Sequence, residues 1–130
     1  MKRKKITFIV LVVVLVSASI SLILNYPKSK FVGSRSGNDS QLIMSYSILN
    51  TTDFQMLELE AGDTVEFNVF SASGEIDIVL QKEGEEPIYI GSDVPSSSFE
   101  VKISNSGTYK ASVTGRNSSG SVWIKKVNNH

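Results

Sequence analysis

An alternation of apolar and polar residues recurs in the sequence from Gln41 onward and limits what this part of the chain can fold into. In residues 64–70, for example, Val65, Phe67 and Val69 are separated by polar residues. A period of two places apolar side chains on one face of an extended strand. Segments of this kind recur every eight to twelve residues, at 42–48, 54–60, 64–70, 75–80, 88–90, 99–103, 109–113 and 122–124.

These segments predict an all-β domain over residues 41–130. Clusters of Gly, Asn, Asp and Ser separate them and are typical of tight turns, and no helical period is present after Leu24. Each strand has one apolar face, which must be buried against a second sheet. We therefore predict an antiparallel β-sandwich of seven or eight strands.

The N-terminal part of the chain has a different character. Residues 1–5 carry four basic side chains, and residues 6–24 contain no charge and are mainly apolar. This pattern predicts that residues 6–26 form a membrane-spanning helix, with residues 1–5 cytoplasmic and the rest of the chain on the other side. Two interpretations stay open: an uncleaved anchor, which we favour, and a signal peptide cleaved between Ala18 and Ser19.

Composition restricts what the exported part can bind. Residues 27–40 are rich in Ser and Gly and predict a linker between membrane and domain. Four of the 13 basic residues precede Ile6, so nine remain against 13 acidic residues, a net charge of −4. We therefore expect no nucleic-acid partner. The sequence contains no Cys, so the fold has to rest on its hydrophobic core without disulfide bonds.

The sequence contains no recognisable catalytic or metal-binding pattern. His130, the single His, is the last residue, and without Cys the common nucleophile–base pairs cannot be assembled. Glu83, Glu85, Glu86 and Asp93 lack the spacing of a calcium loop, and we interpret them as solvated turns. We expect no catalysis, no metal and no cofactor.

Three aromatic residues form the candidate binding site. Phe70, Tyr89 and Trp123 all have the parity opposite to the expected core positions of their strands, which predicts exposed rings. Exposed rings on a flat sheet can stack on sugars or anchor a protein contact.

Three segments also resemble known bacterial extracytoplasmic modules: LEAGDTVEFNV (59–69), EIDIVL (75–80) and SGTYKASVTGRNSSGSVWI (106–124). They are similar to the pre-peptidase C-terminal domains of secreted enzymes, and the last one also resembles the late strand of the Golgi-dynamics (GOLD) sandwich domains. The resemblance implies a jelly-roll-like fold with a binding or stabilising task and no catalytic residues. Here no catalytic domain accompanies the module.

Together these observations predict a membrane-anchored module of the bacterial cell envelope that works by binding, with its domain outside the cytoplasmic membrane. The expected partner is another envelope protein. The alternatives are a cell-wall or extracellular glycan as the ligand, and a secreted protein if the chain is cleaved near Ala18.

Overall fold

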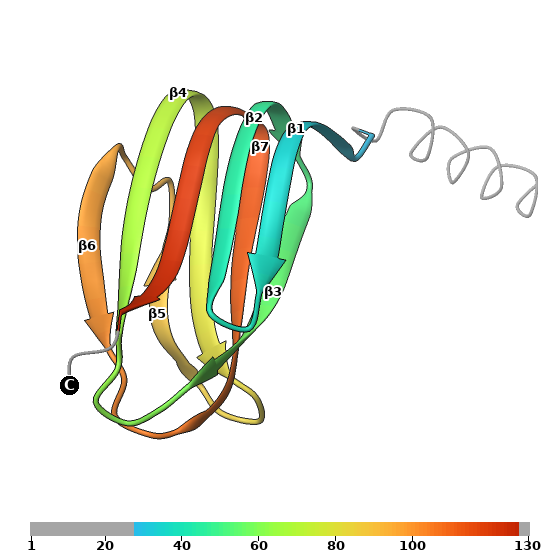
Figure 1. Cartoon of the computed structure of the whole chain (residues 1–130). Coiled ribbons are helices and arrows are strands. Elements are labelled where there is room, and N and C mark those ends of the chain that lie inside the picture. The colour runs from blue at the N-terminus through green and yellow to red at the C-terminus, as the bar shows by residue number, and fades with distance from the viewer. Residues whose placement is uncertain (1–27, 128–130) are drawn as a thin grey trace, which may run out of the picture.

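The computed structural model describes residues 28–127 and confirms the all-β prediction (Figure 1). Every strand pair in it is antiparallel. The seven strands are β1 (Lys30–Asn38), β2 (Gln41–Asn50), β3 (Thr52–Leu59), β4 (Thr64–Lys82), β5 (Pro87–Gly91), β6 (Ser97–Lys102) and β7 (Gly107–Val127).

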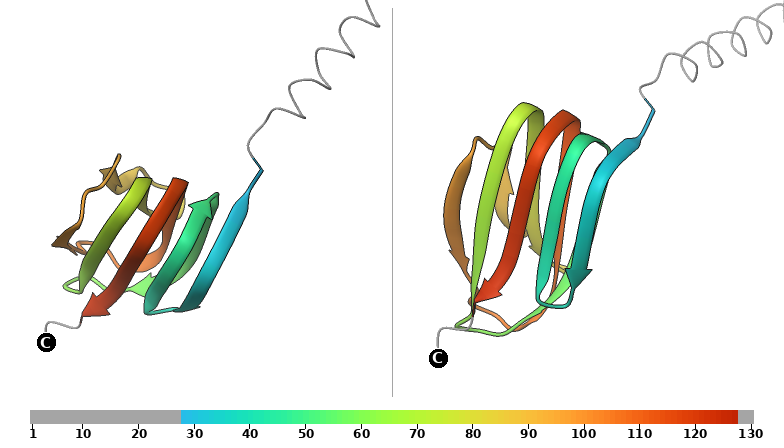
Figure 2. Two further views of the ribbon diagram at one scale, coloured as in Figure 1. Left: turned by 90° about the horizontal axis from the view of Figure 1, so that it is seen from above. Right: turned by 45° about the horizontal axis from the view of Figure 1, so that its top comes forward.

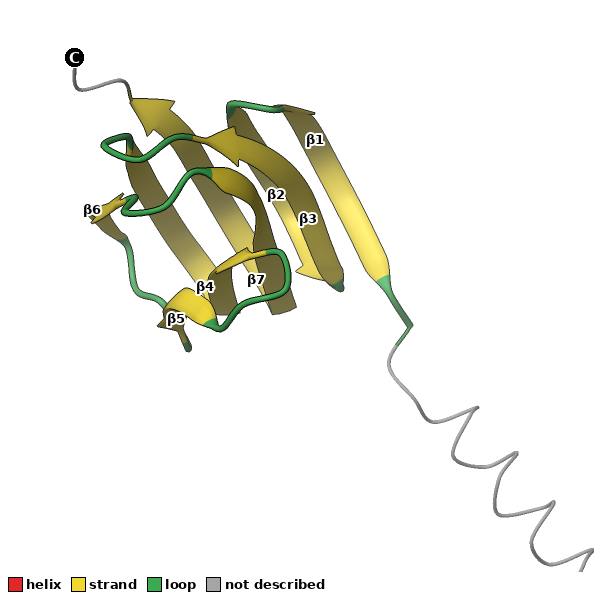
Figure 3. Ribbon diagram, turned by 90° about the horizontal axis from the view of Figure 1, so that it is seen from below, coloured by secondary structure: helices red, strands yellow, loops and turns green. Residues whose placement is uncertain are grey.

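Two long strands, β4 and β7, build both layers of the sandwich. They pair with each other along nearly their whole length and bend together, so that each contributes one half to each layer. The first layer contains β1, β2, the second half of β7, the first half of β4, and β6. The second layer contains β3, the first half of β7, the second half of β4, and β5. The left view of Figure 2 and Figure 3 show the two layers from above and from below.

The bends lie where the sequence predicts turns between separate strands. At residues 71–74 and 116–120 the chain changes layer while the pairing of β4 with β7 continues on both sides, from Phe70 with Ser121 to Glu75 with Arg116. The ladder absorbs the change through register shifts around Ser73. Gly74 has φ of 71°, a conformation that costs glycine little. The prediction that turns at these two places separate distinct strands is wrong, because β4 and β7 continue through them.

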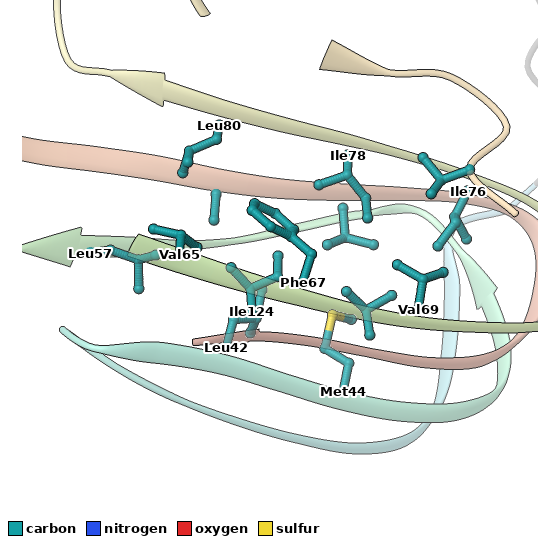
Figure 4. Close-up of a cluster of buried hydrophobic side chains, with 14 of the residues drawn as sticks. Leu42, Met44, Leu57, Val65, Phe67, Val69, Ile76, Ile78, Leu80 and Ile124 are labelled. Carbon is teal, nitrogen blue, oxygen red and sulfur yellow. The ribbon is translucent and has the colours of Figure 1, made fainter. Parts of the chain in front are cut away.

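The core lies between the layers, as the alternation predicts (Figure 4). Near its centre, the Phe67 ring stacks on Phe99 with centroids 4.8 Å apart and has Tyr89 at 5.5 Å. The buried apolar side chains come from β2, β3, β4, β7 and the loops after β5 and β6: Leu42, Met44, Tyr46, Leu49, Leu57, Leu59, Val65, Phe67, Val69, Ile76, Ile78, Leu80, Val94, Ile103, Tyr109, Ala111, Val113, Val122 and Ile124.

Residues 30–38, which the sequence predicts to belong to a linker, instead form strand β1. All nine residues are exposed, so β1 adds nothing to the core and is attached through its ladder with β2. In β1, Gly33, Arg35 and Gly37 pair with core residues of β2. A side chain at Gly37 would collide with Gln55. The linker prediction is therefore wrong for these residues, and only 27–29 remain between β1 and the predicted membrane segment.

The predicted segments 1–5 and 6–26, with the candidate cleavage site at Ala18 and Ser19, lie outside the described residues. Among residues 28–127 no helix has the length and apolar character needed to cross a membrane.

Candidate functional site

The outer face of the first layer carries two rows of uncharged residues that run across the strands. Directly paired residues of antiparallel strands place their side chains on the same face. We call the row formed by Ser36, Ile43, Trp123, Asn68 and Ser98 the Trp row. The neighbouring row nearer the bends, called the upper row, consists of Ser34, Ser45, Ser121 and Phe70.

Trp123 and Phe70 are the exposed rings of this face. Trp123 is 44% exposed and Phe70 58% exposed, as their parity predicts. They stand on β7 and β4 at diagonal positions of the ladder, and Asn68 and Ser121 occupy the other diagonal. These four residues and Val69 line a shallow depression of about 370 Å³. The arrangement combines two apolar ring faces with an amide and a hydroxyl in one small area.

The polar groups next to Trp123 are held in place by hydrogen bonds. The Ser98 hydroxyl donates to Asn68 Oδ1, and Asn68 Nδ2 donates to Glu66 Oε1 at 3.3 Å. The amide therefore has a defined orientation on the surface. The Lys125 ammonium lies 4.6 Å from the centre of the Trp123 ring, which attracts the cation and restricts the indole. The Asn68 amide and the Lys125 ammonium, which both adjoin the indole, are thus held in place without a ligand.

Tyr89, the third predicted residue, does not belong to this face. It pairs with the core residue Leu80 and lies against Phe67 and Phe99, with its ring centroid 5.0 Å from that of Phe99. Burial raises the pKa of its hydroxyl. Its neighbours Ile88 and Ile90 are the exposed residues of β5, at 43% and 66%. The predicted outward parity of Tyr89 is wrong.

The sequence reasoning missed an exposed ring on the other side of the molecule. Phe54 on β3 is 49% exposed, and the Lys110 ammonium lies 4.4 Å from its ring centre. Together with Met56 and Glu83, these residues line a shallow depression of about 320 Å³ on the second layer. The sequence did indicate this exposure, because Phe54 has the parity of Glu58 and not that of the core residue Leu57.

A charged cluster stands at the bends. Arg116 bonds to Asp77 through both terminal nitrogens and to Glu75 Oε2 through Nε at 3.0 Å. These bonds hold the pKa of the Asp77 carboxyl below its usual range and raise that of the guanidinium. Because the guanidinium is bonded to both carboxylates within the protein, Arg116 offers little free charge to an anionic ligand.

The acidic residues of the predicted turns are separated in space. Glu85 follows β4 and lies 3.7 Å from the Lys82 ammonium. Asp93 lies near the bends, where its amide donates to Asp77 Oδ1 at 2.8 Å. Within residues 28–127, no three acidic or His side chains are arranged to hold a metal ion.

Comparison with known proteins finds similarity at the level of structure. No family model matches the sequence, and no curated protein matches it significantly. One similar structure is the periplasmic inhibitor of g-type lysozyme from Aeromonas hydrophila, with a TM-score of 0.49 and 18% identity over 74% of this chain and 95% of that chain.

A second similar structure is the pre-peptidase C-terminal domain of a Bacillus anthracis collagenase, with a TM-score of 0.48 and 16% identity over 79% of this chain and 100% of that chain. The domain type that the sequence resembles is thus among the structural matches. A cupin domain from Bordetella pertussis matches at a TM-score of 0.37 and 8% identity, over 79% of this chain and 99% of that chain. At these identities the likeness concerns the path of the chain and does not say what this chain binds.

Proposed function

We propose that this chain is a non-catalytic, jelly-roll-like binding module of the bacterial cell envelope. In this proposal residues 6–26 hold it at the membrane, residues 28–127 lie outside the cytoplasm, and the Trp row with Phe70 is its contact surface. The alternative for the N-terminal segment is cleavage before Ser19, which would release the same module.

The observation that carries the proposal is the exposure of Trp123 at the centre of a five-stranded face. Leaving a large ring half in water forgoes about 1 kcal/mol or more of burial free energy. Trp123 stands on β7, which is flanked on both sides by paired strands, so the backbone beneath the ring is rigid. A rigid aromatic anchor with oriented polar neighbours is what a binding surface requires.

The second exposed ring fits this role less well. Phe54 stands on β3, which pairs only with β7 among the described strands and therefore forms an edge of the sheet. It has no indole N–H to donate. Phe54 therefore provides the matched control, because it has similar exposure and a similar Lys contact on the opposite layer.

The proposal is tested by retention of the purified full chain, in detergent micelles, on washed cell-envelope material. We expect the wild-type protein and Phe54→Ala to be retained equally, and Trp123→Ala and Phe70→Ala to be depleted at least tenfold. All variants should keep the wild-type melting temperature, because these side chains lie outside the core. Equal retention of Trp123→Ala and the wild type would refute this surface as the contact site.

The membrane attachment has a separate test. Mass spectrometry of the mature protein should find the intact N-terminus in the membrane fraction. A mature chain that begins at Ser19 would show that the module is released.

A further inference from the structure

We propose that the ligand of this face is an uncharged polysaccharide that lies across the strands along the Trp row. This inference rests on the proposed function, because it names the ligand class of the same surface. It follows from the charge, the hydrogen-bonding groups and the shape of the face.

The absence of charge is the first argument. The nine residues of the Trp row and the upper row include no acidic or basic side chain. The nearest charges, Lys125, Glu66 and Glu100, belong to the next row and are of both signs. Of these, the Lys125 ammonium lies 4.6 Å from the centre of the Trp123 ring, and Glu66 accepts a bond from Asn68. A polyanion is bound by clusters of Lys and Arg, and a single Lys of the next row is no such cluster. An uncharged ligand brings no charge of its own that the face would have to pair.

The hydrogen-bonding groups are the second argument. Five of the nine residues in the two rows are Ser, and a sixth is Asn68. A hydroxyl both donates and accepts, and an amide does both through separate atoms. Sugar hydroxyls have the same dual capacity, so donors and acceptors can be matched along the whole row. The bond from Ser98 to Asn68 Oδ1 shows that neighbouring groups of the row already pair in this way.

The shape of the face is the third argument. The Trp row crosses five adjacent strands, which at a spacing of about 4.8 Å gives a track about 19 Å long. Trp123 stands at its middle, between Ile43 and Asn68. The C–H face of a sugar ring is apolar and flat enough to stack on an indole, while its rim of hydroxyls points sideways. A linear chain of several sugars would thus place one ring on Trp123 and its hydroxyls on the Ser residues.

A folded protein partner fits the same surface less well. A stable protein contact buries about 800 Å² on each side and has a closely packed apolar centre. Here Ile43 pairs with Trp123, and Phe70 stands diagonally across the ladder from it. This apolar area is small, and polar side chains border it, namely Ser45, Ser121 and Asn68. A ligand with a small apolar face and a rim of hydroxyls matches this pattern.

The inference is tested with the fluorescence of Trp123, the single Trp of the chain. The full chain, in a zwitterionic detergent without a sugar head group, is titrated with soluble cello-, laminari- and chito-oligosaccharides and with dextran sulfate as a polyanion. We expect at least one uncharged series to shift the emission to shorter wavelength and to protect the indole from acrylamide. Affinity should rise with chain length until the ligand covers the Trp row.

Variants then locate the ligand. Asn68→Ala should weaken binding about tenfold, because it removes an oriented amide from the row, and Phe70→Ala should weaken it as well. Phe54→Ala should leave the titration unchanged. A fluorescence response that is unaffected by both Asn68→Ala and Phe70→Ala would overturn the inference.

The proposal about the ligand class and the proposal about the contact surface can be refuted separately. If retention on envelope material depends on Trp123 but no uncharged oligosaccharide changes the fluorescence, the glycan inference is wrong and the contact surface stands. A response to dextran sulfate alone would also overturn the glycan inference. If retention on envelope material does not depend on Trp123, the proposed contact surface itself is wrong.

Discussion

Strand β1 should open independently of the rest of the fold, and Arg35 should control how often it does so. All nine residues of β1 are exposed, so its opening transfers no buried apolar side chain to water. Besides its ladder with β2 and a bond from the Ser47 hydroxyl to the Val32 carbonyl, β1 is held by Arg35. Its Nε lies 3.0 Å from Asp53 Oδ2, and its Nη2 donates to the Phe54 carbonyl at 2.7 Å and to Gln55 Oε1 at 3.0 Å. These bonds connect β1 in the first layer to β3 in the second.

The expected effect of Arg35→Ala follows from these contacts. A partly exposed ion pair contributes up to about 1 kcal/mol, and two further bonds from a charged donor at the surface add a comparable amount. We therefore expect the free energy of opening β1 to fall by about 1–2 kcal/mol. This corresponds to about 5- to 30-fold faster local exchange of its amides.

The assay is amide hydrogen exchange of the full chain, followed by mass spectrometry of peptides. In Arg35→Ala, peptides covering residues 30–38 should exchange faster, while peptides from the second half of β4 should be unchanged. Arg116→Ala is the control, because that Arg makes a similar number of bonds but makes them at the bends. Unchanged exchange of β1 in Arg35→Ala, or an equal acceleration over the whole domain, would refute the reasoning.

Three further predictions concern the core and the bends. Tyr46→Phe should leave the free energy of unfolding unchanged or raise it, because this buried hydroxyl has no partner within hydrogen-bond geometry. Tyr109→Phe should lower the free energy of unfolding by about 1 kcal/mol, because it loses the 2.6 Å bond to the Asn105 carbonyl. Urea unfolding measures the stability of both variants. Phe67→Ala should lower the free energy of unfolding by about 3–5 kcal/mol in the same assay, and a loss below 1 kcal/mol would contradict its central position. The lowered pKa of Asp77 means that its pairing with Arg116 stabilises the fold above about pH 4 and is lost as the pH falls through that lowered pKa. Arg116→Gln should therefore be less stable than the wild type at pH 6, and the difference should shrink as the pH falls below about 4; a difference that does not change with pH would exclude this cause.

The buried Tyr46 and Ser118 hydroxyls are neighbours without a geometric hydrogen bond. Ser118 nevertheless lies close enough to oppose, in part, the rise that burial causes in the pKa of Tyr46. This weak interaction is why the Tyr46→Phe prediction includes an unchanged stability.

The alternation of apolar residues was sufficient to predict the layers of the core. Val65, Phe67 and Val69 point inward as expected, because burial of a strand face leaves a period of two in the sequence. The exposure of Phe70 and Trp123 followed from the same parity. The sequence therefore predicts which side chains face the core and which face solvent, because side-chain burial determines this pattern.

The errors concern features that burial does not encode. Strand β1 is held by backbone bonds, which nearly any sequence can form, so its Ser and Gly residues resembled a linker. Tyr89 lies between two Ile residues, and three apolar residues in succession carry no parity; a register shift between Leu80 and Gln81 adds to the ambiguity. The bend at residues 71–74 has the composition of a hairpin turn, and only the pairing beyond it distinguishes the two.

The direction of β1 determines how the strand resists a pulling force, and this resistance differs from its free energy of opening. The strand begins at Lys30 beside the bends, and the last described strand ends at Val127 near the opposite end of the sandwich. The ladder bonds of antiparallel strands lie perpendicular to the strand axis. A pull on Lys30 along that axis, opposed at Val127, therefore shears the whole ladder of β1 at once and does not peel it bond by bond. The strand that we expect thermal fluctuations to release most easily should therefore resist a pull in this direction.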